Sequence, residues 1–337
     1  MRSRLLTREF FEALISAPSL QQLIQDLHET EYGPDLEDAL IHGRDAASVD
    51  EALKNNIVRT YRKVLGFLND EGAYIISALL GRWDVFNIKT VLRGVHMHLA
   101  PEQIAEGLLP VGQLSVVDLG ELARLEDVRG VVETAFTWGL PYASAMREGH
   151  AKFLNTGELS AMESSLDRYY TQWAAKQLQK RGANMEMARR ILGIQVDIVN
   201  LLMVLRMQRA DVASVDTDSF FLEGGRDVSR ELCGELFRMS DVDQVLDRLR
   251  GTPYGNVLDG VATQFLEANS IAVFERALED YLMRKALALS TTDALGVGVA
   301  ISYLWAKQNE VTNLRIIVKG MAVGMPVERV RGELILV

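Results

Sequence analysis

Three acidic residues, each with an asparagine three positions later, are the residues whose types and spacing could do chemistry. Asp84, Asp197 and Glu310 open near-copies of one decamer, "DVFNIKTVLR", "DIVNLLMVLR" and "EVTNLRIIVK". Successive copies lie 113 residues apart. Three carboxylates that converged within several ångströms could act together as an enzyme's carboxylate cluster, and their pKa values would then be shifted. That chemistry is one hypothesis for the repeated acid.

A structural role is the other hypothesis, because each decamer reads as an amphipathic helix. At 100° per residue, Leu201, Val204 and Leu205 form one apolar stripe, and the other copies repeat it. The acid and the asparagine lie beside this stripe, where an unpaired polar group is costly. We therefore expect them to hydrogen-bond a neighbouring helix, with the terminal base pointing roughly opposite. The positions concerned are Asp84, Asn87, Arg93, Asp197, Asn200, Arg206, Glu310, Asn313 and Lys319.

The repetition extends well beyond the decamer. Glutamates recur 112 residues apart, Gly112 and Gly225 are 113 residues apart, and three helix pairs each end in a tyrosine. The glutamates are Glu51, Glu163 and Glu275, and the tyrosines are Tyr32, Tyr142 and Tyr254. A unit of about 112 residues therefore occurs three times. The sequence predicts helical repeats at 1–100, 101–213 and 214–337.

The elements that carry these residues are predicted to be helices throughout. Apolar residues recur at i, i+3 and i+4, strict alternation is almost absent, and all seven prolines stand where helices would begin or end. The predicted fold is all-α. Three copies of one unit favour three similar lobes in a closed ring with pseudo-three-fold symmetry. An open solenoid is the competing arrangement.

The common catalytic and metal-binding motifs do not occur. The sequence contains no G-x-x-x-x-G-K-[ST] and no G-x-S-x-G. His28 in "HETEY" has no histidine four residues later, and His96 and His98 cannot share a metal from one helix face. The single cysteine, Cys233, allows no internal disulfide and is expected to be a semi-buried apolar residue. We expect no catalytic residue, no metal and no cofactor in this chain.

The composition restricts the partners. A net charge of −10 argues against nucleic acid and against direct docking on anionic lipid. The longest uncharged apolar stretch, 294–306, has 13 residues, fewer than the roughly 20 that span a bilayer. No signal peptide is recognisable, so we expect a soluble protein. The acidic surplus could steer basic partner helices toward the chain, or could serve solubility alone.

Four stretches resemble one family, the C subunits of the V/A-type rotary ATPases, which are the counterparts of the d subunit in eukaryotic V-ATPases. They are "RWDVFNIKTVLRG", "LLPVGQLS", "VDIVNLLMVLRMQ" and "ISYLWAKQNEVTNLRIIVKGMAVGMPVERVRGEL". The resemblance covers essentially the whole chain, and the last stretch is the most specific. Family members usually carry a short aromatic-containing leader before the first helix, whereas this chain begins at "MRSRLL".

The resemblance implies a non-catalytic rotor part, a funnel of three lobes. Its socket would receive the central shaft subunits, and its base would sit on the cytoplasmic face of the membrane proteolipid ring. The protein would transmit torque that couples ATP turnover to H+ or Na+ translocation. It would be monomeric on its own and peripheral to the cell membrane, with no membrane span. The alternative is an unrelated all-α scaffold of solenoid type without enzymatic activity.

Overall fold

The structure, a computed structural model, describes residues 4–41, 43–209, 220–239, 241–292 and 296–337. Over these ranges the regular secondary structure is helical and no strand occurs, which confirms the all-α prediction. The helices of residues 4–106 are α1 (Arg8–Ile15), α2 (Leu20–His28), α3 (Gly33–Ala39), α4 (Ala46–Phe67), α5 (Asp70–His96) and α6 (Pro101–Glu106).

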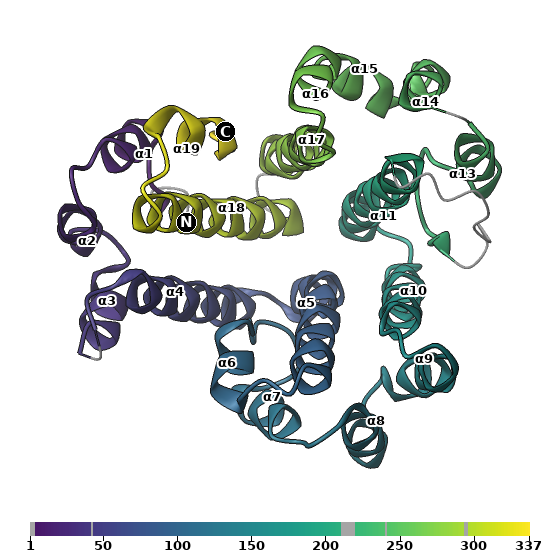
Figure 1. Cartoon of the computed structure of the whole chain (residues 1–337), viewed down its shortest axis with the longest axis horizontal. Coiled ribbons are helices and arrows are strands. Elements are labelled where there is room, and N and C mark those ends of the chain that lie inside the picture. Colours follow the sequence, from purple (N-terminus) through teal and green to yellow (C-terminus); the bar gives the residue numbers. More distant parts are fainter. Residues whose placement is uncertain (1–3, 42, 210–219, 240, 293–295) are drawn as a thin grey trace. The chain divides into compact units, whose positions relative to one another are not determined.

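Further helices follow in the same pattern of short helices between long ones (Figure 1). Those of residues 107–209 are α7 (Val116–Ala123), α8 (Val128–Thr137), α9 (Ala143–Thr156), α10 (Ser160–Gln177) and α11 (Ala183–Arg209). The remaining ones are α13 (Arg230–Phe237), α14 (Val242–Leu249), α15 (Pro253–Asp259), α16 (Ala262–Ala268), α17 (Ala272–Thr292), α18 (Val297–Ala322) and α19 (Val327–Glu333).

Short polar side chains start equivalent helices. Thr7, Ser115 and Ser229 precede α1, α7 and α13, and each hydroxyl accepts a hydrogen bond from a backbone N–H in the first turn. The side-chain oxygens of Ser19, Asp127 and Asp241 accept equivalent hydrogen bonds at the starts of α2, α8 and α14. These caps satisfy N–H groups that the helix itself leaves unpaired. The recurrence therefore fixes the same helix starts in each third of the sequence.

The chain forms two compact units. The terminal unit combines Met1–Ala73 with Met283–Val337, and the middle unit is Tyr74–Leu282. Within the terminal unit, α4 packs along α18 and α1 packs against α19 (Figure 1). Within the middle unit, α9 packs against α10, and α11 contacts α10, α13 and α14. Segments from the two ends of the sequence thus fold together.

The apolar stripe of the second decamer belongs to a hydrophobic core in the middle unit. Leu201, Val204 and Leu205 on α11 are fully buried, and their cluster includes Leu249 and Phe274. Burying each such side chain contributes about 1.5–3 kcal/mol relative to leaving it exposed. The helical period read from the sequence therefore identifies one of the buried faces of α11.

One helix in the described part of the chain, α11, is long and apolar enough to cross a membrane by length and composition. Its most apolar window is 61% buried in the structure. The core helix of a soluble protein passes the same test, so this is weak support for a membrane span.

Candidate functional site: three buried carboxylates

The first repeated acid, Asp84 on α5, is held by the turn that precedes α7. The backbone N–H groups of Gln113 and Leu114 donate to its carboxylate at 2.9 and 3.0 Å. The Tyr142 hydroxyl donates to Oδ2 at 2.8 Å. Gly112 comes so close that a Cβ there would lie 2.2 Å from Oδ1. Asp84 is fully buried, and its acceptor oxygens are occupied by protein donors.

The second acid, Asp197 on α11, has the same surroundings in its own third of the sequence. It accepts hydrogen bonds from the backbone N–H groups of Arg226, Asp227 and Val228 at 2.8–3.1 Å. The Tyr254 hydroxyl donates to Oδ2 at 2.8 Å. A Cβ on Gly225 would again lie 2.2 Å from Oδ1. The glycine and the tyrosine therefore belong to the site as much as the acid does.

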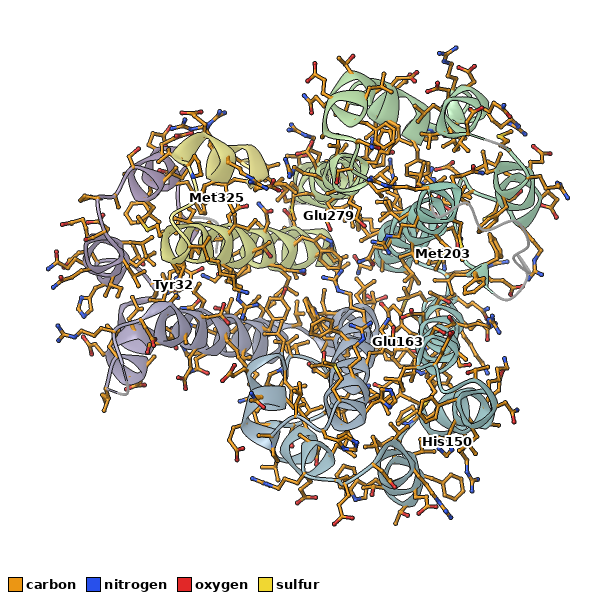
Figure 2. The ribbon with its side chains drawn as sticks, viewed as in Figure 1. Tyr32, His150, Glu163, Met203, Glu279 and Met325 are labelled. Atoms are coloured by element: carbon orange, nitrogen blue, oxygen red, sulfur yellow. The ribbon has the colours of Figure 1, made fainter. Side chains whose placement is uncertain are left out.

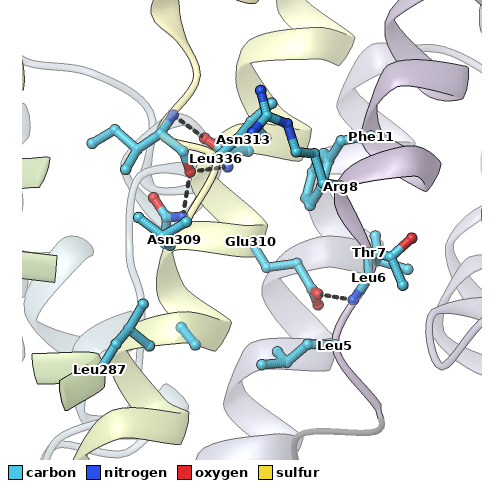
Figure 3. A pocket seen from close by; sticks show the side chains of 13 residues that line it. Leu5, Leu6, Thr7, Arg8, Phe11, Leu287, Asn309, Glu310, Asn313 and Leu336 are labelled. Atoms are coloured by element: carbon cyan, nitrogen blue, oxygen red, sulfur yellow. Dashed lines mark hydrogen bonds between the residues drawn. The ribbon is translucent and has the colours of Figure 1, made fainter. Parts of the chain in front are cut away.

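The third acid, Glu310 on α18, lies in the terminal unit and is 3% exposed. Its carboxylate accepts hydrogen bonds from the Leu6 N–H at 2.5 Å, the Tyr32 hydroxyl at 2.7 Å and the Lys307 ammonium at 2.8 Å. Figure 3 shows the side chain of Glu310 directed toward the backbone of Leu6. Glu310 also lines a pocket of about 400 Å³, with Phe11 among the other lining residues.

The three asparagines make one hydrogen-bond pattern. The amides of Asn87, Asn200 and Asn313 each donate Nδ2 to a backbone carbonyl and accept the N–H of the same residue through Oδ1. The paired residues are Leu109, Leu222 and Ile335, again 113 positions apart. This two-bond pairing resembles the hydrogen bonds between two strands. It ties a segment further along the chain to each long helix, since Leu109 follows α6 and Ile335 follows α19. The asparagines are at most 2% exposed.

Burial dominates the pKa values at these sites. Burial raises the pKa of Asp84 and Asp197, while the backbone N–H groups and the tyrosine hydroxyls act in the lowering direction. Burial and the neighbouring carboxylates raise the pKa of Tyr142 and Tyr254 well above the usual tyrosine value. Each pair therefore has a hydroxyl that keeps its proton and donates it to the acid in a hydrogen bond.

The bases and glutamates of the repeats form ion pairs near the surface. Arg93 contacts Glu163 through two hydrogen bonds, of 2.6 and 2.7 Å, and Arg206 pairs with Glu275. Glu163 on α10 is labelled in Figure 2. In the terminal unit the corresponding pair joins Arg315 and Asp50 at 2.7 Å. The repeated positions of that copy, Glu51 and Lys319, are both exposed.

The arrangement counts against the carboxylate-cluster hypothesis. Each of the three acids has its own set of donors, and no bond joins one acid to another in the described residues. Among those residues no group of three His, Cys, Asp or Glu side chains could hold a metal ion. Cys233 is buried, and burial raises its pKa to about 11, so it stays a thiol at neutral pH.

Four side chains that complete these sites were not predicted from the sequence as partners of the acids. For Tyr32, Tyr142 and Tyr254, the nearly even spacing is the signal that could have identified them. Lys307 has no repeated counterpart, because the equivalent positions, Gly81 and Ile194, carry no charge, and its i, i+3 spacing from Glu310 is the signal that could have identified it. A partner that occurs in one copy only cannot be found by looking for repetition.

Known proteins match this chain over nearly its whole length. Residues 1–333 match the family described as ATP synthase (C/AC39) subunit. The C subunit of the A-type ATP synthase of Methanocaldococcus jannaschii is 27% identical, over 96% of this chain and 80% of that protein. The same component from Methanobrevibacter smithii is 31% identical, over 80% of this chain and 70% of that protein.

A bacterial relative shows the same similarity. The C subunit of the V-type ATP synthase of Deinococcus radiodurans is 28% identical, over 99% of this chain and 88% of that protein. The family match extends from the first helix to α19. The resemblance inferred from the four sequence stretches is therefore confirmed. The chain belongs to the ATP synthase (C/AC39) subunit family.

Proposed function

We propose that this chain is a non-catalytic central-stalk rotor component of a V/A-type rotary ATPase or ATP synthase. In this role it is a socket that links the central shaft to the membrane proteolipid ring. The observation that carries the proposal is that the repeated polar residues hydrogen-bond other parts of the same chain. The most regular chemical groups of the chain, Asp84 and Asp197 with their tyrosines, are engaged in fixing backbone turns.

Such anchors suit a mechanical part. A buried carboxylate whose donors are all in place resists displacement, because separating it from them would leave charged and polar groups unsatisfied. The same anchor ties the start of α7 to α5 and the start of α13 to α11. A protein that transmits torque requires stiff joints of this kind more than it requires a reactive side chain.

The expected partners are the central shaft subunits and the cytoplasmic face of the proteolipid ring. The protein is then peripheral, held at the membrane by the ring, without a span of its own and without a nucleic-acid partner. The fold expected for this role is three similar lobes, from repeats at 1–100, 101–213 and 214–337. Hydrogen bonds run across these boundaries, since Tyr142 bonds Asp84 and Tyr254 bonds Asp197.

Co-expression with the shaft and ring subunits of the same organism, followed by affinity capture, tests the proposal. We expect the tagged chain to retain shaft subunits and, in detergent, the ring. A tagged acidic protein of similar mass serves as the control for charge-driven capture. A chain that captures neither partner contradicts the proposal.

Two further measurements separate the alternatives. The purified chain should hydrolyse no ATP, whereas the assembled complex should. Small-angle scattering should give a compact monomeric particle. An elongated particle would favour the unrelated solenoid scaffold instead.

A further inference from the structure

The three repeated acids differ in what compensates their charge. Asp84 accepts hydrogen bonds from two backbone N–H groups, and Asp197 accepts them from three. Glu310 accepts one, from Leu6. A tyrosine hydroxyl is common to all three sites. The third site therefore lacks part of the backbone donation that the other two sites have.

A lysine supplies the missing donor at the third site. The Lys307 ammonium lies 2.8 Å from Oε1 of Glu310 and 2.9 Å from the Tyr32 hydroxyl, and 4.0 Å from the centre of the Tyr32 ring. Lys307 is 2% exposed. The terminal cluster, Tyr32, Lys307 and Glu310, thus contains an ion pair whose two side chains are at most 3% exposed.

The acid itself also differs in length. At the first two sites an aspartate faces a glycine so closely that a Cβ on Gly112 or Gly225 would lie 2.2 Å from the aspartate Oδ1. At the third site a glutamate, one methylene longer, reaches its donors on Leu6 and Tyr32. The longer acid and the lysine thus occur together at the site that has the fewest backbone donors.

We propose that Lys307 is a positioning residue that takes the place of the backbone N–H groups and fastens the N-terminal segment Arg4–Thr7 to α18 through Glu310. Leu6 donates to Glu310, and the next residue, Thr7, caps α1. The terminal cluster therefore holds the residue that directly precedes the N-cap of α1. Arg331 of α19 adds a contact to Glu12 of α1 at 3.1 Å.

Because this ion pair is buried, an apolar residue in place of the lysine should destabilise the fold while the acid remains. An isolated carboxylate in such a place carries a large desolvation penalty. Burial lowers the pKa of Lys307, and the Glu310 carboxylate acts in the opposite direction. Each charge is therefore tolerated because the other is present. These contacts hold the N-terminal segment whether or not the chain acts as a rotor part.

A double-mutant cycle with Lys307→Met and Glu310→Gln on the full-length chain tests the inference. Lys307→Met should lower the melting temperature by several degrees and speed hydrogen exchange of the Leu6 amide at least tenfold. The Leu114 amide, which is bonded to Asp84, is the internal control and should keep its exchange rate. The double variant Lys307→Met/Glu310→Gln should regain at least half of both losses, because no buried carboxylate is left uncompensated.

Additive losses in the double variant would overturn the inference, because Lys307 would then contribute packing rather than charge. A double variant that fails to fold would overturn it as well. Lys307→Met with unchanged Leu6 exchange would show that other contacts hold the N-terminal segment. Leu6 protection in the double variant close to that of the wild type supports the inference even if the single variant is insoluble.

Discussion

Tyr32 and Glu310 lie 278 positions apart in the sequence, and the Tyr32 hydroxyl donates to the Glu310 carboxylate at 2.7 Å. The same relationship joins Tyr142 to Asp84 across 58 positions. The same tyrosine–carboxylate contact thus joins the two ends of the chain at Glu310, whereas at Asp84 it joins residues of one continuous stretch. The residues that pack together as one repeat are therefore not always consecutive in the sequence, because the tyrosine of the third acid comes from the N-terminal part of the chain.

Replacing Asn200 by leucine should destabilise the fold. The change removes both bonds to Leu222 and leaves a buried N–H and carbonyl without partners, which costs about 1–3 kcal/mol. Urea unfolding followed by circular dichroism measures the loss. An unchanged unfolding midpoint would show that the Leu222 backbone finds other partners.

Replacing Gly112 by alanine should destabilise the fold because the added Cβ would collide with the Asp84 carboxylate. Overpacking of this kind costs about 1–3 kcal/mol. Gly120→Ala is the matched control, because nothing lies within 4 Å of its Cβ and the residue is inside α7. Alanine there should stabilise by about 0.5–1 kcal/mol. Equal thermal shifts in the two variants would contradict the collision.

Alkaline pH should unfold the protein through its buried tyrosines. The pKa of Tyr254 is raised in the fold, so its stabilising contribution is complete below the unfolded value of about 10 and is lost as pH rises above it. Each such group adds a slope of about 1.4 kcal/mol per pH unit. Burial likewise raises the pKa of Tyr170, to about 12.

Tyr254→Phe tests this pH dependence. The variant loses the bond to Asp197 and should be less stable at pH 8, but its unfolding free energy should fall less steeply between about pH 10 and pH 11. Tyr142→Phe should behave in the same way because its contacts are equivalent. Parallel curves for wild type and both variants would refute the assignment.

The ion pair between Arg93 and Glu163 should contribute little. Arg93 is 56% exposed, and exposed pairs are usually worth about 0.2–1 kcal/mol and weaken in salt. We expect Arg93→Ala to lower stability within that range at low salt, with the difference mostly gone at about 1 M NaCl. A large effect that persisted in salt would indicate that the arginine side chain acts through packing.

Periodicity predicted the helical class, the buried stripe around Leu201 and the polar positions Asp84 and Asn87 without knowledge of their partners. It did so because every copy buries one face of a helix, and its apolar residues therefore recur at the helical period. Periodicity did not show which residues form the ion pair of the terminal unit. Arg315 and Asp50 form it, and they are not the repeated positions Lys319 and Glu51. Small shifts between copies preserve the contact while changing the residues that make it.

The sequence by itself determined that one helical unit is repeated and that each copy carries an acid and an asparagine beside an apolar stripe. It determined this because a helix is formed by residues close together in the sequence, so that its apolar and polar faces can be read from their spacing. Only the tertiary structure decided the distant partners, which are the tyrosine of another segment and the glycine turn, whereas Lys307 lies three residues before the third acid on the same helix. Most of those contacts join residues tens to hundreds of positions apart, and they exist only once the chain has packed.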